Sequence, residues 1–269
     1  MSEETLHDSE RTFHDQWAES ERADAVEIDA AFEAITAPEN RFILGILGDV
    51  RGKTLLDVGT GLGESAIYFA KLGAKVTAID ISPKMVELCL ENSRRLGVEL
   101  TAQVATGEDL GLPDAAFDIV YAANVLHHIH DRDQFLATLR RVLKPGGLFV
   151  AWDPVKYNPI INVYRRKATK VRTPDEQPLG YADLARVRRY FPDARSRTFW
   201  LTSTALFLKY YLLDRKQPND MRYWKVILRE TPRSIGWWFL PLQRRDRLLL
   251  RIPLFDMLAW NVVQWGRKP

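Results

Sequence analysis

The sequence predicts an α/β fold in which helices cover both faces of a parallel β-sheet. Between residues 54 and 152, short apolar runs alternate with stretches whose apolar residues recur at helical spacing. Strands that alternate with helices favour right-handed crossovers, and therefore a doubly wound, mostly parallel sheet. The length of 269 residues suits one large domain of this kind, or one domain that carries an insertion.

The elements of the sheet domain follow in order along the chain. Thr54–Val58 is a short apolar run that ends at Gly59, as expected of a buried strand. Ser82 caps a later helix with Pro83 at its first position, and Gly97 ends it. Strands are expected at residues 54–58, 75–79, 100–105, 117–123 and 148–152, and helices at 64–72, 82–96 and 131–143, the last ended by Pro145, Gly146 and Gly147.

The flanking segments do not follow this alternation. Residues 1–20 have the character of a frayed lead, and Pro38 divides the helical pattern of residues 23–47 into two helices. After Asp153 we expect a helix at 181–190, a strand at 196–201, an apolar helix at 202–213 and a closing strand at 259–265.

Composition places the chain among ordinary globular proteins, with 46% hydrophobic and 27% charged residues. The single cysteine, Cys89, cannot form an intramolecular disulfide and fits a reducing compartment. The acidic N-terminus MSEETLHDSE does not resemble a signal peptide, and no apolar run approaches the roughly 20 residues of a membrane-spanning helix. We therefore expect a cytoplasmic protein.

Charge is distributed unevenly. Residues 1–40 contain 12 acidic and 2 basic residues, whereas residues 197–269 contain 14 basic and 5 acidic residues. The basic region also carries aromatic and arginine clusters, among them Tyr210, Tyr211, Trp237, Trp238 and Phe239, then Arg244, Arg245, Arg247 and Arg251. Two interpretations stay open. The region is a peripheral contact with an anionic membrane, or it is a helical cap whose arginines are solvated or pair with the N-terminal acids.

The most informative motif is the glycine-rich turn LDVGTGLG at residues 56–63, between the first strand and its helix. Glycines there let the backbone approach a ligand closely. The sixth position of a dinucleotide fingerprint would be glycine, but here it is Glu64, which would face a pyrophosphate. Asp57 suits a ligand with a positive charge, and Asp80, at the end of the second strand, suits the two hydroxyls of a ribose. Alternatively, Asp57 is a turn cap and Asp80 a solvated acid.

Four motifs in order carry a family resemblance: LDVGTGLG, AIDISPKM, LPDAAFDIVYAANVLHHI and LKPGG, within residues 56–147. Together they resemble the class I S-adenosyl-L-methionine-dependent methyltransferases. The resemblance implies a Rossmann-like, seven-stranded, mostly parallel sheet whose last strand is antiparallel, with S-adenosyl-L-methionine as the cofactor. It also implies a division into an N-terminal helical lid (1–50), a cofactor-binding core (51–201), a helical insertion or cap (202–256) and a closing strand (257–269).

The resemblance assigns roles residue by residue. Gly59, Gly61 and Gly63 bring backbone to the methionine moiety, and Asp57 holds its ammonium side. Asp80 binds the ribose, and Ile81 packs on the adenine. Asn124 offers its carbonyl oxygen to the methionine amine. Where the family carries an acid that accepts from the adenine amino group, this chain has Thr106, followed by Gly107 and Glu108.

The catalytic candidates are His127 and His128, which follow the fourth strand and titrate near neutral pH. A general base is needed only for an acceptor that is protonated at neutral pH. Packing or capping of the following helix is the alternative. Asp153 and Tyr157 are acceptor-pocket candidates. We expect no metal site, because the histidine cluster lacks a distant carboxylate or cysteine partner in the sequence.

The predicted function is methyl transfer by in-line displacement to a small-molecule or lipid-like acceptor. A nicotinamide-dependent oxidoreductase is disfavoured by the glycine spacing and Glu64. A nucleic-acid methyltransferase would carry an Asn-Pro-Pro-Tyr-type or Pro-Cys signature, and neither is present. Nucleic acid is therefore not an expected partner. A cofactor-binding protein without catalysis remains the third alternative.

Overall fold

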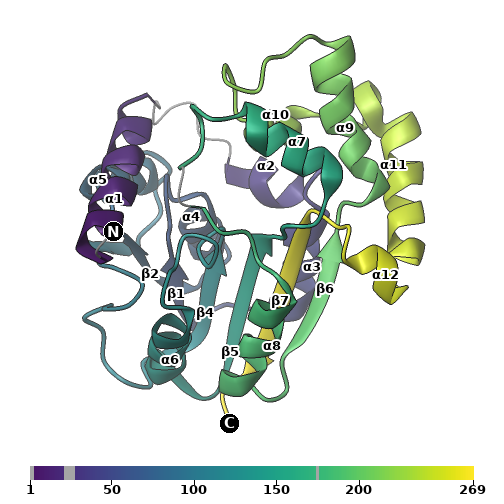
Figure 1. Ribbon diagram of the computed structural model, residues 1–269. Coiled ribbons are helices and arrows are strands. Elements are labelled where there is room, and N and C mark those ends of the chain that lie inside the picture. Colours follow the sequence, from purple (N-terminus) through teal and green to yellow (C-terminus); the bar gives the residue numbers. More distant parts are fainter. Residues whose placement is uncertain (1–2, 21–27, 174–175) are drawn as a thin grey trace.

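The computed structural model describes residues 3–20, 28–173 and 176–269, and a seven-stranded sheet runs through its centre (Figure 1). The strand order is β3-β2-β1-β4-β5-β7-β6. β7 pairs antiparallel with both β5 and β6, and the other pairs are parallel. The strands are β1 Thr54–Val58, β2 Lys75–Asp80, β3 Thr101–Val104, β4 Phe117–Ala123, β5 Leu143–Pro154, β6 Arg195–Phe199 and β7 Asn261–Arg267. The predicted doubly wound sheet with an antiparallel last strand is confirmed.

Helices cover both faces of the sheet (Figure 1). One apolar cluster joins the sheet to α2, α3, α4 and the helices between β6 and β7, and a second joins the other face to α6 and α8. The helices are α1 Glu3–Ser20, α2 Ile28–Glu33, α3 Pro38–Leu47, α4 Glu64–Lys71, α5 Pro83–Arg95, α6 Arg132–Val142, α7 Pro159–Lys167, α8 Tyr181–Tyr190, α9 Ala205–Leu208, α10 Tyr223–Val226, α11 Pro232–Leu249 and α12 Pro253–Asp256.

The N-terminal helices and the segment between β6 and β7 are joined by buried hydrogen bonds. Glu39 on α3 accepts from the indole N–H of Trp200, at 2.9 Å, and from the side-chain amide of Asn261, at 3.1 Å. Gln243 on α11 donates to the carbonyl oxygen of Ile35 at 2.7 Å. Burial raises the pKa of Glu39 to about 7. The N-terminal helices, the residues that follow β6, and the segment from α11 to β7 are distant in sequence but therefore pack together.

Residues 1–20 are not a frayed lead where they are described. Residues 3–20 form α1, which packs against α5 through a cluster of Ala18, Leu62 and Met85. The side chain of Ser82 donates to Asp15 at 2.5 Å. The prediction was wrong because the partners of α1 lie more than forty residues away, so its own sequence does not reveal its packing.

The expected helix at 202–213 is broken into a 3-10 turn at Thr202–Thr204, α9, and a π-helical turn at Lys209–Leu213. Its start is held by Asp246 of α11, whose buried carboxylate accepts from the backbone N–H groups of Leu201, Thr202 and Ser203. This cap comes from another helix, which explains why no local start signal is visible.

Two smaller expectations also need correction. The closing strand was expected at residues 259–265, whereas β7 spans Asn261–Arg267. Before the strand begins, the Trp260 N–H donates to the carbonyl oxygens of Phe199 and Trp200, and the pairing with β6 starts at Asn261. The Pro-Gly-Gly sequence after α6 is not a helix stop in a loop but lies within β5, where Gly146 and Gly147 exchange hydrogen bonds with Lys268. Among the described residues, no helix is long and apolar enough to cross a membrane.

Candidate functional site

The glycine turn after β1 is shaped by close contacts. Gly59, with φ 69°, lies so near Val125 that an added Cβ atom would be 2.4 Å from a Val125 methyl carbon. At Gly63, with φ 88°, an added Cβ atom would be 2.7 Å from the Cys89 sulfur. Gly61, with φ 53°, has open space where a Cβ would be. The turn therefore packs on one side and leaves its Gly61 side available to a ligand.

Asp57 lies under this turn and is almost fully buried. One carboxylate oxygen accepts from the hydroxyls of Thr60 and Ser65, each at 2.7 Å. Burial raises the pKa of Asp57 to about 7. Asp57 therefore fixes the turn and the start of α4, as the turn-cap alternative expects, and its charge depends on pH near neutrality.

Asp80 closes the second strand against the same turn. Its two carboxylate oxygens accept from the backbone N–H groups of Gly61, at 2.8 Å, and Ser82, at 3.0 Å. Ile81, between them, is half-buried. The carboxyl ends of β1 and β2 are thus tied together at one edge of the sheet, as the strand order requires.

A buried acid, Glu108, follows β3 and lies two residues after Thr106, the position at which the family resemblance expects an acid. The Thr106 hydroxyl accepts from the Asp109 N–H at 3.1 Å, so it caps a turn. Glu108 is buried instead, and its Oε2 atom has no hydrogen-bond partner, although the His7 ring of α1 lies 3.4 Å away. At Gly107 an added Cβ would be 2.7 Å from the Phe135 ring. Of the two side chains, only Glu108 therefore presents a buried oxygen that accepts no hydrogen bond.

Asn124 ends β4 in a left-handed conformation with φ 56°, which asparagine tolerates better than most residues. Its N–H donates to the Trp152 carbonyl oxygen at 2.8 Å, and the residue itself is exposed. The conformation turns the chain into the loop that carries Val125, which contacts Gly59, and then His127.

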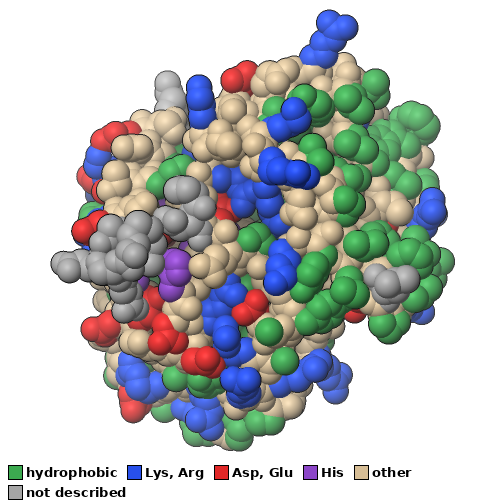
Figure 2. Space-filling model, in the orientation of Figure 1, with side chains coloured by type: hydrophobic (Ala, Val, Ile, Leu, Met, Phe, Trp, Pro, Cys, Tyr) green, Lys and Arg blue, Asp and Glu red, His purple; other side chains and the backbone are tan. Residues whose placement is uncertain are grey.

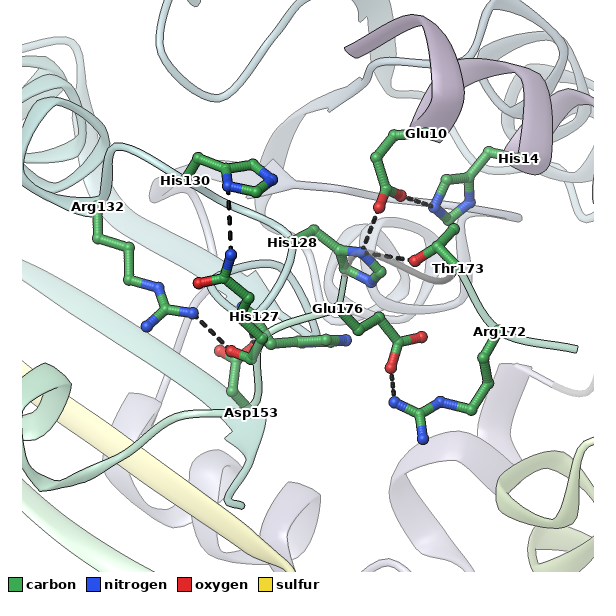
Figure 3. Close-up of polar contacts among 11 residues, drawn as sticks. Glu10, His14, His127, His128, His130, Arg132, Asp153, Arg172, Thr173 and Glu176 are labelled. Carbon is green, nitrogen blue, oxygen red and sulfur yellow. Dashed lines mark hydrogen bonds and ion pairs between the residues drawn. The ribbon is translucent and has the colours of Figure 1, made fainter. Parts of the chain in front are cut away.

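His127 and Asp153 form a buried pair (Figure 3). Imidazole Nδ1 lies 2.8 Å from Asp153 Oδ1, which also accepts from the His127 backbone N–H at 3.2 Å. Burial, reinforced by His128 and nearby arginines, lowers the pKa of His127 well below its usual value. The ring is therefore neutral, and the tautomer that donates Nδ1–H to Asp153 leaves Nε2 with a lone pair.

His128 belongs to a different set of contacts. Its Nδ1 lies 3.0 Å from Glu10 Oε1 on α1 and 3.4 Å from the Thr173 hydroxyl. His14, also on α1, places Nε2 3.5 Å from Glu10 Oε2. The carboxylate partner that the sequence lacked near the histidine cluster is thus supplied by the fold (Figure 3).

Tyr157 does not lie with Asp153. The Asp153 carboxylate contacts His127 and is 1% exposed, and it does not line the cavity at Tyr157. Tyr157 stacks on Tyr181 and lines a cavity of about 1030 Å³ beside the edge strand β6. Six arginines share that cavity: Arg41, Arg188, Arg195, Arg197, Arg247 and Arg251.

Sequence reasoning expected a helical lid at residues 1–50 but missed which side chains of α1 reach the site. Its side chains reach the three strand ends already described: His7 to Glu108, Asp15 to Ser82, and Glu10 to His128. The available signal was the spacing of His7, Glu10 and His14, which one helix face presents together. Polar residues on one face of an N-terminal helix point to a buried polar partner.

Residues 56–151 match the protein family described as a methyltransferase domain. This segment is a class I, S-adenosyl-L-methionine-dependent methyltransferase domain. Over 108 residues, 40% of this chain, it is 39% identical to the demethylmenaquinone methyltransferase of Tropheryma whipplei. Over 124 residues, 45% of the chain, it is 38% identical to the 27-O-demethylrifamycin SV methyltransferase of Amycolatopsis mediterranei.

The matched segment of the chain covers 44% and 45% of these two relatives, less than half of their length. A solved structure extends the likeness of fold beyond the methyltransferase domain. The YcgJ protein of Bacillus subtilis superposes with a TM-score of 0.56 at 17% identity, over 85% of this chain and 97% of that protein.

Proposed function

We propose that this chain transfers the methyl group of S-adenosyl-L-methionine to a hydroxyl of a small-molecule or lipid-like acceptor. One observation carries the proposal. The open side of the glycine turn, the Asp80 carboxylate and the buried Glu108 oxygen that accepts no hydrogen bond lie at successive strand ends of one sheet edge. That set matches a ligand with a cationic end, a ribose diol and an adenine amino group.

The residues of the chain divide the work. When bound, S-adenosyl-L-methionine supplies a methyl group already activated by a sulfonium charge. Asp80 and Glu108 orient the nucleoside, and α1 covers the site through Asp15 and His7. Holding the two reactants in line can lower the barrier by about 7–11 kcal/mol. As the carbon–sulfur bond breaks and the carbon–oxygen bond forms, the hydroxyl proton passes to Nε2 of His127.

Asp153 supports that proton transfer. It accepts the Nδ1–H of His127, so the tautomer with a free Nε2 is fixed before the acceptor binds. Burial raises the pKa of Asp153 well above its usual value, and a positive charge on the adjacent ring would favour the ionised carboxyl, which in turn stabilises that charge. General-base assistance of this type contributes roughly 10²–10⁴-fold in rate.

The acceptor class is supported by the surface between β6 and β7. Large apolar side chains are exposed on α11 and on the turns near it, and hydrophobic side chains gather over this side of the molecule in Figure 2. They are Leu208, Leu212, Leu213, Trp237, Leu248 and Ile252, with exposures from 40% to 80%. Arg244 and Arg245 are exposed on the same helix as Trp237 and Leu248. Rings, leucines and arginines together suit an anionic membrane interface.

The cavity beside this surface is lined by arginines, so it adds positive charge to that of Arg244 and Arg245. Burial, together with Arg247 and Arg251, lowers the pKa of Arg197. Like charges are therefore crowded there, which favours anionic headgroups over neutral ones. We infer that the protein contacts the membrane peripherally to collect a lipid-like acceptor. The demethylmenaquinone methyltransferase among its relatives is named for an acceptor of that class.

Methyl transfer is tested with S-adenosyl-L-methionine labelled in the methyl group, incubated with demethylated quinones, other lipid phenols and water-soluble phenols. We expect label in an organic-soluble hydroxylated acceptor, and much less label with Asp80→Ala at a concentration of S-adenosyl-L-methionine that does not saturate this variant. If no acceptor is labelled while S-adenosyl-L-methionine binds normally, the chain is a cofactor-binding protein without catalysis, and the proposal is wrong.

Membrane contact is tested by sedimentation with liposomes. We expect binding to vesicles that contain anionic lipid, weakening with salt, and loss when Arg244, Arg245 and Arg247 are changed to glutamate. Neutral vesicles are the control. Wild-type protein that stays in the supernatant with anionic vesicles at low salt would show that the surface is only a cap.

A further inference from the structure

We propose that Glu10, His14 and His128 bind one divalent transition-metal ion, which joins α1 to the loop that follows β4. Each residue offers one ligand atom, and these three atoms all lie within 4.8 Å of one another. Two imidazoles and one carboxylate form a common ligand set for such ions. The site does not depend on the proposed methyl transfer.

The arrangement follows from helix geometry. Glu10 and His14 are four residues apart on α1, so they project from the same face one turn apart. The same spacing places the two histidines of a His-Glu-x-x-His zinc site on one helix face. His128 comes from a loop more than a hundred residues later, and its ring centroid lies 5.9 Å from that of His14 (Figure 3).

Two buried polar atoms of the cluster make no hydrogen bond. They are Glu10 Oε2, which has only an ion-pair contact with His14 Nε2 at 3.5 Å, and His14 Nδ1. Hydrogen bonding alone therefore does not account for the cluster, because buried polar atoms are normally paired. A metal ion bound by Glu10 would give its Oε2 atom a stronger partner.

A second group of possible ligands shares His128. His127, His128 and Glu176 also place their ligand atoms within 4.8 Å of one another. Asp153 holds the His127 ring from the opposite side, which is how metal-bound histidines are usually oriented. Glu176 forms an ion pair with Arg172, so its carboxylate is already neutralised. We therefore assign the ion to the group on α1 and leave His127 to the acceptor.

The donor types decide which ions fit. Magnesium and calcium prefer oxygen ligands almost exclusively, whereas two imidazole nitrogens and one carboxylate suit zinc, cobalt or iron in the divalent state.

The competing explanation is that Glu10, His14 and His128 form an ion-paired latch without a metal. Burial alone would raise the pKa of Glu10, but the contacts with His128 and then with His14 hold this pKa well below its usual range. A latch of this kind would join α1 to the loop without any metal.

The consequence of a bound ion is a fixed α1. This helix also carries Asp15 and His7, which reach the ends of β2 and β3. An ion held by Glu10, His14 and His128 would therefore order the cover of the nucleoside-binding edge, and metal availability would control access to it.

The test uses the full chain without a polyhistidine tag, stripped of metal by a chelator and titrated with Zn²⁺ in a non-chelating buffer. We expect one ion per chain by calorimetry, and slower amide hydrogen exchange in residues 3–20 after Zn²⁺ is added. His14→Ala, His128→Ala and the conservative Glu10→Gln should each weaken Zn²⁺ binding by at least about tenfold.

His130→Ala is the matched control, because this histidine lies in the same loop but outside both ligand groups. It should bind Zn²⁺ as the wild type does. The proposal is overturned if wild type takes up no stoichiometric Zn²⁺, if Glu10→Gln and His14→Ala bind as tightly as wild type, or if His130→Ala loses binding equally. No methyl donor is present, so failure here leaves methyl transfer untouched.

Discussion

The two halves of the molecule are assembled differently. The proposed nucleoside-binding edge and the His127 loop beside it lie within residues 56–128, where the site residues lie at or shortly after the ends of their strands, and the contacts at the glycine turn are short in sequence. The opposite half joins residues 28–47 to residues 200–261 through side chains such as Glu39, Trp200 and Gln243. A change in the first half should therefore alter binding or rate, whereas a change in the second should alter stability.

The largest expected effect is on the reaction rate. Replacing His127 with alanine removes the proposed base while the Asp80 edge stays intact, so kcat should fall by about 10²–10⁴-fold with unchanged affinity for S-adenosyl-L-methionine. Steady-state kinetics and calorimetry on the same preparation measure both. His130→Ala should retain wild-type kcat, and a His127→Ala enzyme with normal kcat would remove His127 from catalysis.

The next effect is on cofactor affinity. Asp80→Ala removes the acceptor of two ribose hydroxyls, and hydrogen bonds to charged groups are worth roughly 1.5–3 kcal/mol. Affinity for S-adenosyl-L-methionine should fall about ten- to a hundredfold with the fold intact. The exposed Asp114, changed to alanine, is the control. Equal affinity in a folded Asp80→Ala protein would place the ribose elsewhere.

In the second half, the expected effect is on stability. Trp200→Phe leaves Glu39 without one of its two donors, which should lower the free energy of unfolding by about 1–3 kcal/mol. Because burial raises the pKa of Glu39 to about 7, the loss should be greater at pH 8, where the carboxyl is ionised, than at pH 6. Denaturant unfolding at the two pH values measures it.

Trp237→Phe provides the comparison, since this indole is 80% exposed. It should leave the unfolding free energy within about 0.5 kcal/mol of wild type. A Trp200→Phe protein that weakens cofactor binding without losing stability would contradict the separation of the two halves.

The smallest effect is a pH dependence of cofactor affinity. Burial raises the pKa of Asp57 to about 7, so the free protein is protonated there below neutrality. A cationic ligand favours the ionised carboxyl, so binding releases a proton, and affinity should rise by up to about tenfold from pH 5 to pH 7 and then level off. Calorimetry across this range should give a flat profile for Asp57→Asn. A flat profile for wild type would mean that Asp57 only fixes the turn.

The first half could be predicted closely from the sequence, because its signals are local. The strand ends, the cap at Ser82 and the glycine turn lie next to the residues they position, so the parallel sheet and the group of Asp57, Gly61 and Asp80 follow from spacing. The exception is the adenine side, where Glu108 and not Thr106 presents a buried oxygen. Glu108 lies two residues after the expected position, in an irregular loop where no periodic pattern indicates which side chain is buried.

The rest could not be predicted because its partners are distant in sequence. The start of the segment at residues 202–213 is capped by Asp246, and α1 is held by Ser82 and His128. Nothing near Glu10 or His14 in the sequence indicates that a loop histidine completes their cluster. The sequence analysis found no distant carboxylate partner for the histidine cluster, whereas the fold places Glu10 against His128.

The central claim is that the sheet edge formed by β1, β2 and β3 binds a sulfonium nucleoside. Titration calorimetry of the wild-type chain with S-adenosyl-L-methionine, its demethylated product and nicotinamide dinucleotides tests this directly. Binding of the first two in the micromolar range, with nothing comparable for the dinucleotides, is the predicted result. Tighter binding of a nicotinamide dinucleotide than of S-adenosyl-L-methionine would contradict the account.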